Sequence, residues 1–102
     1  MRVCALVTDL MDRSKISSAV TGVEFVRAAA ACTGAGVVIV DLAKFGDQVA
    51  ALRASSPAAR MICFGPHVDD AGAAGAREAG ADVVLPRSKF FHDPSAAIGA
   101  TD

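Results

Sequence analysis

The sequence predicts an α/β fold in which one three-layer domain, residues 1–102, is built around a doubly wound, parallel five-stranded sheet in the order 2-1-3-4-5. Two observations lead to this prediction. Apolar runs of strand length recur along the 102 residues, with segments of helical character between them. The runs are continuous and do not alternate with polar residues, which is typical of parallel strands covered by helices on both faces.

Four apolar runs fit central strands, and a fifth, weaker run fits an edge strand. The four central runs are 3–7, 37–40, 61–64 and 83–85. The fifth run, 23–26, follows a turn signal at Thr21 and Gly22 and contains Glu24, a charge that an edge strand tolerates. A second possibility stays open, in which residues 20–31 are entirely helical and the sheet has four strands.

Helices are expected between the strands, over residues 12–20, 26–34, 46–57 and 68–82. The third is the clearest, because Asp47 is a suitable N-cap and Pro57 ends the segment. The fourth contains Gly72 and Gly75, each of which costs a helix about 1 kcal/mol relative to Ala. Little chain follows the last strand, so we expect a last helix that is short or missing and a loose tail over residues 92–102.

Charge and composition exclude several classes of function. Ten basic residues stand against eleven acidic ones, and the chain has no Trp or Tyr. A nearly neutral chain without a basic recognition helix or aromatic stacking residues is not expected to bind nucleic acid. No run approaches the roughly 20 apolar residues of a membrane helix, and the first apolar run is too short for a signal peptide. We therefore expect a cytoplasmic protein that does not act on membranes.

The three cysteines, Cys4, Cys32 and Cys63, are predicted to be reduced and buried. They are odd in number, lie in apolar surroundings and form no CxxC pair. Neither histidine has the spacing to a cysteine that a metal site needs. The sequence thus gives no sign of a disulfide framework or of a zinc site.

Two aspartates end neighbouring strands of the predicted sheet. Asp9 follows the first strand and Asp41 follows the third. In an open parallel sheet, ligands bind beyond the carboxyl ends of the strands where the strand order reverses, which here lies between strands one and three. Two carboxylates there suit a hard cation such as Mg²⁺, and one of them suits nucleophilic attack on phosphorus. The alternative is structural, because an aspartate at a strand end commonly caps the loop or helix that follows.

Motifs of other catalytic classes are absent from the sequence. Residues 8–14, "TDLMDRS", contain no glycine, so no glycine-rich nucleotide loop follows the first strand. No G-x-S-x-G nucleophile elbow occurs, and neither histidine lies in a recognisable triad context. The sequence therefore does not predict an enzyme.

Three segments carry a resemblance to a known family. "VVIVDL", "MICFG" and "VDDAGAAGAREAGADVVLPRSKF" are similar to the receiver domains of bacterial response regulators, which have a flavodoxin-like fold. The resemblance implies two-component signal transduction, in which a histidine kinase phosphorylates an aspartate after strand three and an acidic pair after strand one holds Mg²⁺. Asp41 matches the phosphoacceptor, and Asp9 matches the second member of the acidic pair. No other cofactor is implied.

Other positions depart from the family pattern. Thr8 stands where the first acidic residue is expected, and Gly65 stands at the Thr or Ser position that ends strand four. Arg87 takes the position of the Lys that pairs with the phosphoryl group, with Ser88 in place of the following Pro; Lys89 reaches that position only if the loop shifts. Arg keeps the positive charge but lacks the compact ammonium geometry. Each departure weakens metal binding, phosphoryl chemistry or its readout.

The C-terminal part of the chain suggests a surface for partners. In receivers, the face built from the last strand and its flanking helices contacts partners and supports dimers, and here that part is short. Phe90 and Phe91 are then partly exposed, with His67 and Arg87 around them, or else they belong to the core. A kinase, a downstream regulator or a second copy of the chain would suit such a surface.

Three functions are compatible with the sequence. The first is a stand-alone, atypical receiver-like module that signals through protein contact without a conventional phosphorylation switch. The second is a working single-domain response regulator that is phosphorylated on Asp41 with Mg²⁺ bound. The third is a small-molecule-binding protein or enzyme that uses the crevice beyond the strand ends, lined by Gly65, Pro66 and His67.

Overall fold

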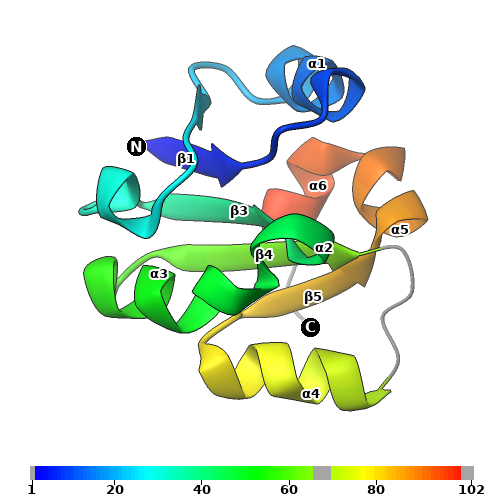
Figure 1. Cartoon of the computed structure of the whole chain (residues 1–102). Coiled ribbons are helices and arrows are strands. Elements are labelled where there is room, and N and C mark those ends of the chain that lie inside the picture. The colour runs from blue at the N-terminus through cyan, green and yellow to red at the C-terminus, as the bar shows by residue number, and fades with distance from the viewer. Residues whose placement is uncertain (1, 66–69, 100–102) are drawn as a thin grey trace.

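The structure, a computed structural model, describes residues 2–65 and 70–99 (Figure 1). Its centre is a parallel sheet of five strands in the order β2-β1-β3-β4-β5, as predicted. The strands are β1 (Val3–Leu6), β2 (Glu24–Phe25), β3 (Val37–Asp41), β4 (Arg60–Gly65) and β5 (Val83–Pro86). The four-stranded alternative is wrong, because Glu24 and Phe25 pair with Cys4 and Ala5 of β1.

Helices cover both faces of the sheet. The helical elements are α1 (Leu10–Ala19), η1 (Ala29–Cys32), α2 (Leu42–Phe45), η2 (Gly46–Gln48), α3 (Val49–Ser55), α4 (Asp70–Ala79), α5 (Arg87–His92) and α6 (Pro94–Gly99). Residues of α1, α5 and α6 pack on one face, and residues of η1, α2, α3 and α4 pack on the other. Alternate residues of β3 supply the two cores, so that Val38 and Val40 face one layer while Val37 and Ile39 face the other.

Two predicted helices differ from the structure. The segment 26–34 forms only the short 3₁₀ turn η1, which lies between the end of β2 at Phe25 and the start of β3 at Val37, and Gly34 after it is in the left-handed region at φ 79°. Asp47 does not cap a helix. It lies in η2, and α3 begins later, at Val49, without a side-chain cap. Because α2 begins directly after Asp41 and η2 follows it, Asp47 already lies within helical structure and does not stand in a loop before a helix.

The loose tail predicted for residues 92–102 is wrong for residues 94–99, which form α6. Pro94 and Ala97 are buried there, and Asp93 accepts a hydrogen bond from the Ala96 N–H at 3.2 Å. The Ser95 hydroxyl donates to the carbonyl oxygen of Ala19 at 2.9 Å, which ties α6 to the end of α1. The helix is short, as expected, but packing against α1 holds it in place.

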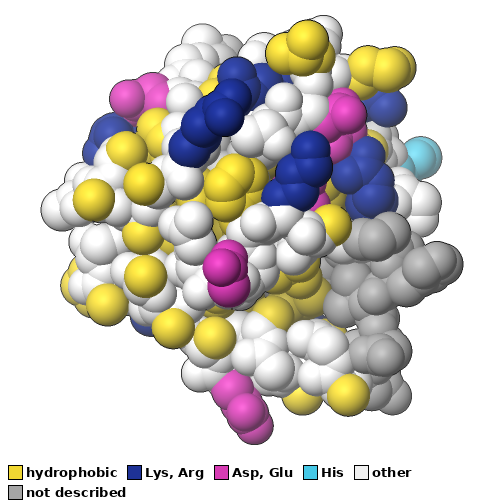
Figure 2. Space-filling view, in the orientation of Figure 1, with side chains coloured by type: hydrophobic (Ala, Val, Ile, Leu, Met, Phe, Trp, Pro, Cys, Tyr) yellow, Lys and Arg dark blue, Asp and Glu magenta, His cyan; other side chains and the backbone are white. Residues whose placement is uncertain are grey.

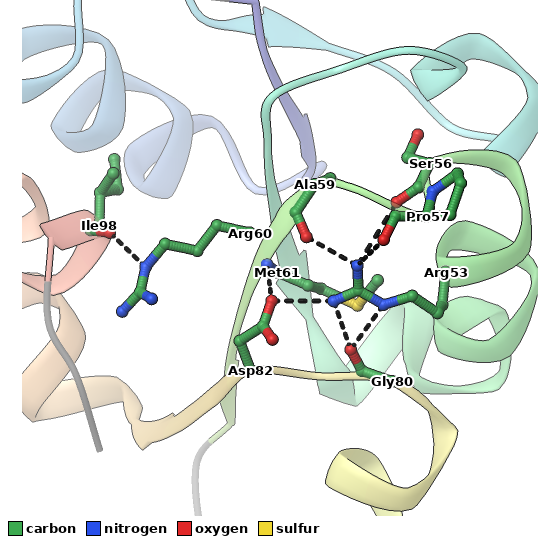
Figure 3. A network of polar contacts seen from close by, with 9 residues as sticks. All are labelled: Arg53, Ser56, Pro57, Ala59, Arg60, Met61, Gly80, Asp82 and Ile98. Atoms are coloured by element: carbon green, nitrogen blue, oxygen red, sulfur yellow. Dashed lines mark hydrogen bonds and ion pairs between the residues drawn. The ribbon is translucent and has the colours of Figure 1, made fainter.

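An arginine network closes the end of the sheet opposite the candidate site (Figure 3). The guanidinium of Arg53 donates to the carbonyl oxygens of Gly80 and Ala59, at 2.7 Å each, and pairs with the Asp82 carboxylate at 2.8 Å. The same Asp82 oxygen accepts from the Met61 N–H at 2.8 Å. These bonds join the end of α3, the start of β4 and the turn before β5.

The three cysteines are buried and free, as predicted. Burial raises the pKa of Cys63 and of Cys32 to about 12 in each case. Within the described part of the chain, every helix is too short or too polar to cross a membrane.

Candidate functional site

Asp41 closes β3 and opens α2. Its carboxylate oxygen Oδ1 accepts a hydrogen bond from the Ala43 N–H at 3.1 Å, and only 4% of the residue is exposed. A buried strand followed at once by a helix leaves unpaired N–H groups, which a short acidic side chain satisfies. The structural interpretation of Asp41 as a cap is therefore confirmed. The residue also lies at the strand end where the topology places a ligand site.

Asp9 performs the same role one strand away. It is the N-cap of α1, and its Oδ1 accepts from the Asp12 N–H at 2.9 Å. This hydrogen bond lowers the pKa of Asp9, and the nearby charges of Lys44 and Arg87 lower it further. Because β1 and β3 pair in parallel, with Leu6 opposite Val40, Asp9 and Asp41 follow neighbouring strands at the same edge of the sheet.

A third carboxylate, Asp12, was not singled out in the sequence. It is 3% exposed on α1 and forms a two-pronged ion pair with Arg87: Nη2 lies 2.7 Å from Oδ1, and Nη1 lies 3.0 Å from Oδ2. One signal could have found it. Asp12 and the buried Ile16 are four residues apart, so they share the inner face of α1. A carboxylate on such a face requires a cation as partner.

Arg87 is held between the acidic residues and a group of aromatic rings. Its guanidinium carbon lies 5.0 Å from the ring centre of Phe91 and 5.5 Å from that of Phe64. The hydrogen bonds to Asp12 raise the pKa of Arg87, and the charges of Asp12, Asp41 and Asp9 add to the shift. The guanidinium therefore lies within the field of all three carboxylates, but it is bonded to Asp12.

A second cation lies beside Thr8. Lys44, on α2, donates from Nζ to the Thr8 hydroxyl oxygen at 3.2 Å. Gly65 is buried at the end of β4, where it pairs with Pro86, and has no side chain to offer. The site thus contains three carboxylates and two cations of the same chain.

Two expected site residues lie elsewhere. Lys89 is exposed on α5 two positions after Arg87, and residues two apart in a helix do not face the same side. Phe90 is fully buried and stacks on Phe64 with ring centres 4.8 Å apart, so of the two possibilities for this residue the structure shows the core and not the surface. Phe91 is half-buried beside Arg87. Pro66 and His67 lie outside the described residues.

Comparison with proteins of known structure identifies the fold of the chain. No family model matches the chain, and no curated protein matches it. A response regulator from Burkholderia pseudomallei, solved with a phosphorylated aspartate, calcium and citrate, matches 96% of this chain and 66% of its own, with 18% identity and a TM-score of 0.75. The activated DrrB receiver domain matches 96% and 93%, with 16% identity and a TM-score of 0.81.

The chain has the receiver fold. A response regulator from Thermotoga maritima agrees, matching 97% of this chain and 98% of its own, with 14% identity and a TM-score of 0.72. The receiver fold gives the five strands and their order. At this level of identity it assigns no chemistry to the individual side chains.

The side chains present do not fit a resident Mg²⁺ ion. Magnesium needs several oxygen ligands in near-octahedral order, and proteins supply carboxylates for it. Within residues 2–65 and 70–99, no three acidic, histidine or cysteine side chains are grouped so that they could hold a metal. Asp12 is bound to Arg87, and Thr8 accepts from Lys44. The remaining pair, Asp9 and Asp41, each accept a backbone N–H.

Proposed function

We propose that this protein is a receiver-like signalling module that acts through contact with another protein, and that its Asp41 site does not work as a conventional phosphorylation switch. One observation carries the proposal. Arg87, at the position where a receiver presents its basic residue to the phosphoryl group, is bonded by both terminal nitrogens to the buried Asp12.

The ion pair between Asp12 and Arg87 makes a phosphorylation switch at Asp41 energetically unfavourable. To meet a phosphoryl group, Arg87 would have to leave Asp12, which is 3% exposed and would lose its partner. Stranding one member of a buried ion pair costs about 3–5 kcal/mol. Gly65 offers no hydroxyl to follow the new group, and Asp41 is itself buried and caps α2. These features support a site whose state is fixed by the chain itself.

Protein contact is supported by the surface beside the site. Leu10 and Met11, on the first turn of α1, are 78% and 70% exposed and are the large hydrophobic residues most open to solvent in the described chain. Figure 2 shows apolar and basic side chains together over the upper part of the molecule, where α1 lies. Adjacent exposed apolar residues next to charges are typical of a binding surface.

Intact-mass spectrometry tests the proposal. The protein is incubated with Mg²⁺ and a small phosphodonor, beside a conventional receiver domain as positive control and Asp41→Asn as negative control. We expect a phosphate-sized adduct on the conventional receiver alone. An adduct that appears on the wild type and disappears in Asp41→Asn would contradict the proposal.

The same experiment decides the second candidate, a response regulator phosphorylated on Asp41. The observation in its favour is that Asp41 ends β3 at the expected place and lies within the field of Arg87. The small-molecule reading stays a prediction, since Pro66 and His67 of its crevice lie outside the described residues.

A further inference from the structure

We infer that Arg87, fixed by Asp12 and assisted by Lys44, is a built-in counterion that takes the place of an exchangeable divalent cation at this site. The inference builds on the proposed function and concerns the same residues. It says which charges offset the carboxylates of Asp9, Asp12 and Asp41, and hence that the site does not respond to the concentration of Mg²⁺.

Two of the three negative charges at the strand ends are offset without an added ion. The negative charges of Asp12, Asp41 and Asp9 all stabilise the charged form of Arg87, and their effects decrease in that order. The hydrogen bonds to Asp12 have a larger effect than any of these charges. Lys44 and Arg87 both act on Asp9. Two cations therefore share the field of three carboxylates, and a divalent ion brought among them would be repelled by both.

The guanidinium is fixed in position. Two hydrogen bonds to one carboxylate orient its plane, and the rings of Phe64 and Phe91 lie against it at 5.5 and 5.0 Å. An arginine keeps its charge at every ordinary pH and cannot dissociate from the chain. Its hydrogen bonds also occupy both oxygens of Asp12, the most buried carboxylate of the three.

The second cation removes a further oxygen ligand. Lys44 donates to the Thr8 hydroxyl, so this oxygen is paired as well. Thr8 occupies the place of the first acidic residue in the receiver pattern, where an added carboxylate would attract a metal. Loss of that carboxylate makes the site less negative, and the charges of Lys44 and Arg87 act in the same direction.

The test measures cation binding directly. Metal-free protein is titrated with Mn²⁺, free Mn²⁺ is followed by electron paramagnetic resonance, and the change in Tm with Mg²⁺ is recorded in parallel. The variants are Arg87→Met, which removes the cation, and Arg87→Lys, which keeps a positive charge. Lys44→Met removes the second cation, which is exposed, so this variant strands no buried charge and serves if Arg87→Met does not fold. Asp41→Asn is added to each Met variant.

We expect the wild type and Arg87→Lys to show no saturation below about 1 mM Mn²⁺, and both Met variants to bind at least about tenfold more tightly. Adding Asp41→Asn should remove the gain. Saturation of the wild type below that concentration, lost in Asp41→Asn, would overturn the inference. So would Met variants that bind no better than the wild type. A phosphate adduct on Asp41 bears on the proposed function alone, so the two can fail separately.

Discussion

Removing Arg87 from the Asp12–Arg87 pair should destabilise the protein more than removing the charge of Asp12. The Asp12 side chain is 4% exposed, whereas that of Arg87 is 37% exposed. In Arg87→Met the carboxylate is left buried without a cation, and we expect a loss of about 3–5 kcal/mol in the free energy of unfolding. In Asp12→Asn the guanidinium can turn toward water, and the loss should be about 1–3 kcal/mol, the worth of hydrogen bonds to a charged group.

Urea unfolding followed by circular dichroism measures both losses. For a domain of about 100 residues, 1 kcal/mol corresponds to about 4–8 °C in Tm, so Arg87→Met should melt at least about 12 °C below the wild type. Lys89→Met is the matched control, because it removes an exposed charge from the same helix, and its change should stay within about 0.5 kcal/mol.

The order of the two losses is the decisive result. A double variant, Asp12→Asn/Arg87→Met, should be less destabilised than the two single losses added together, because it strands no buried charge. If Asp12→Asn costs as much as Arg87→Met, or if the losses simply add, Arg87 is not held by Asp12 in the way described.

Three further predictions concern other parts of the chain. The pKa of Asp9 is lower in the folded state than in the unfolded state. The ionised Asp9 carboxylate therefore stabilises the fold above its unfolded pKa, and this stabilisation is lost as the pH falls through its folded pKa. The difference in the free energy of unfolding between the wild type and Asp9→Ala should narrow from about pH 7 to about pH 2. Burial raises the pKa of Cys63 to about 12, so an aromatic disulfide reagent should label it only after unfolding, and rapid labelling of folded protein would contradict its burial. Gly80 has φ 128°, and a Cβ there would lie 2.6 Å from Cβ of Arg53, so Gly80→Ala should cost about 2–4 kcal/mol in urea unfolding. The control Gly75→Ala, in a helix with open space around it, should stabilise by about 0.5–1 kcal/mol, and equal effects at the two glycines would refute the account.

Most of the sheet could be predicted because four of its five strands are built on an unbroken apolar run. The runs within β1, β3, β4 and β5 are largely buried, and their polar residues, Arg60 and Asp41, stand only at strand ends. The segment 26–34 could not be predicted in the same way. Its alanines favour a helix, but the segment forms only the short 3₁₀ turn η1, so tertiary structure overrides propensity there.

The site was predictable only in part. Asp9 and Asp41 could be placed because they end strands, and the parallel pairing of β1 and β3 brings strand ends together. Asp12 and Lys44 lie on helices, and their roles depend on which way α1 and α2 face. For Lys44, an exposed lysine on one turn of helix, the sequence holds no signal. Arg87 was predicted to pair with a phosphoryl group, and the partner that the structure shows for it is Asp12.

A crystal structure of the protein grown with Mg²⁺ tests the central claim most directly. We expect Arg87 to keep both hydrogen bonds to Asp12, with no metal ion between Asp9 and Asp41. A Mg²⁺ ion held by Asp9 and Asp41, with Arg87 turned away from Asp12, would contradict the account.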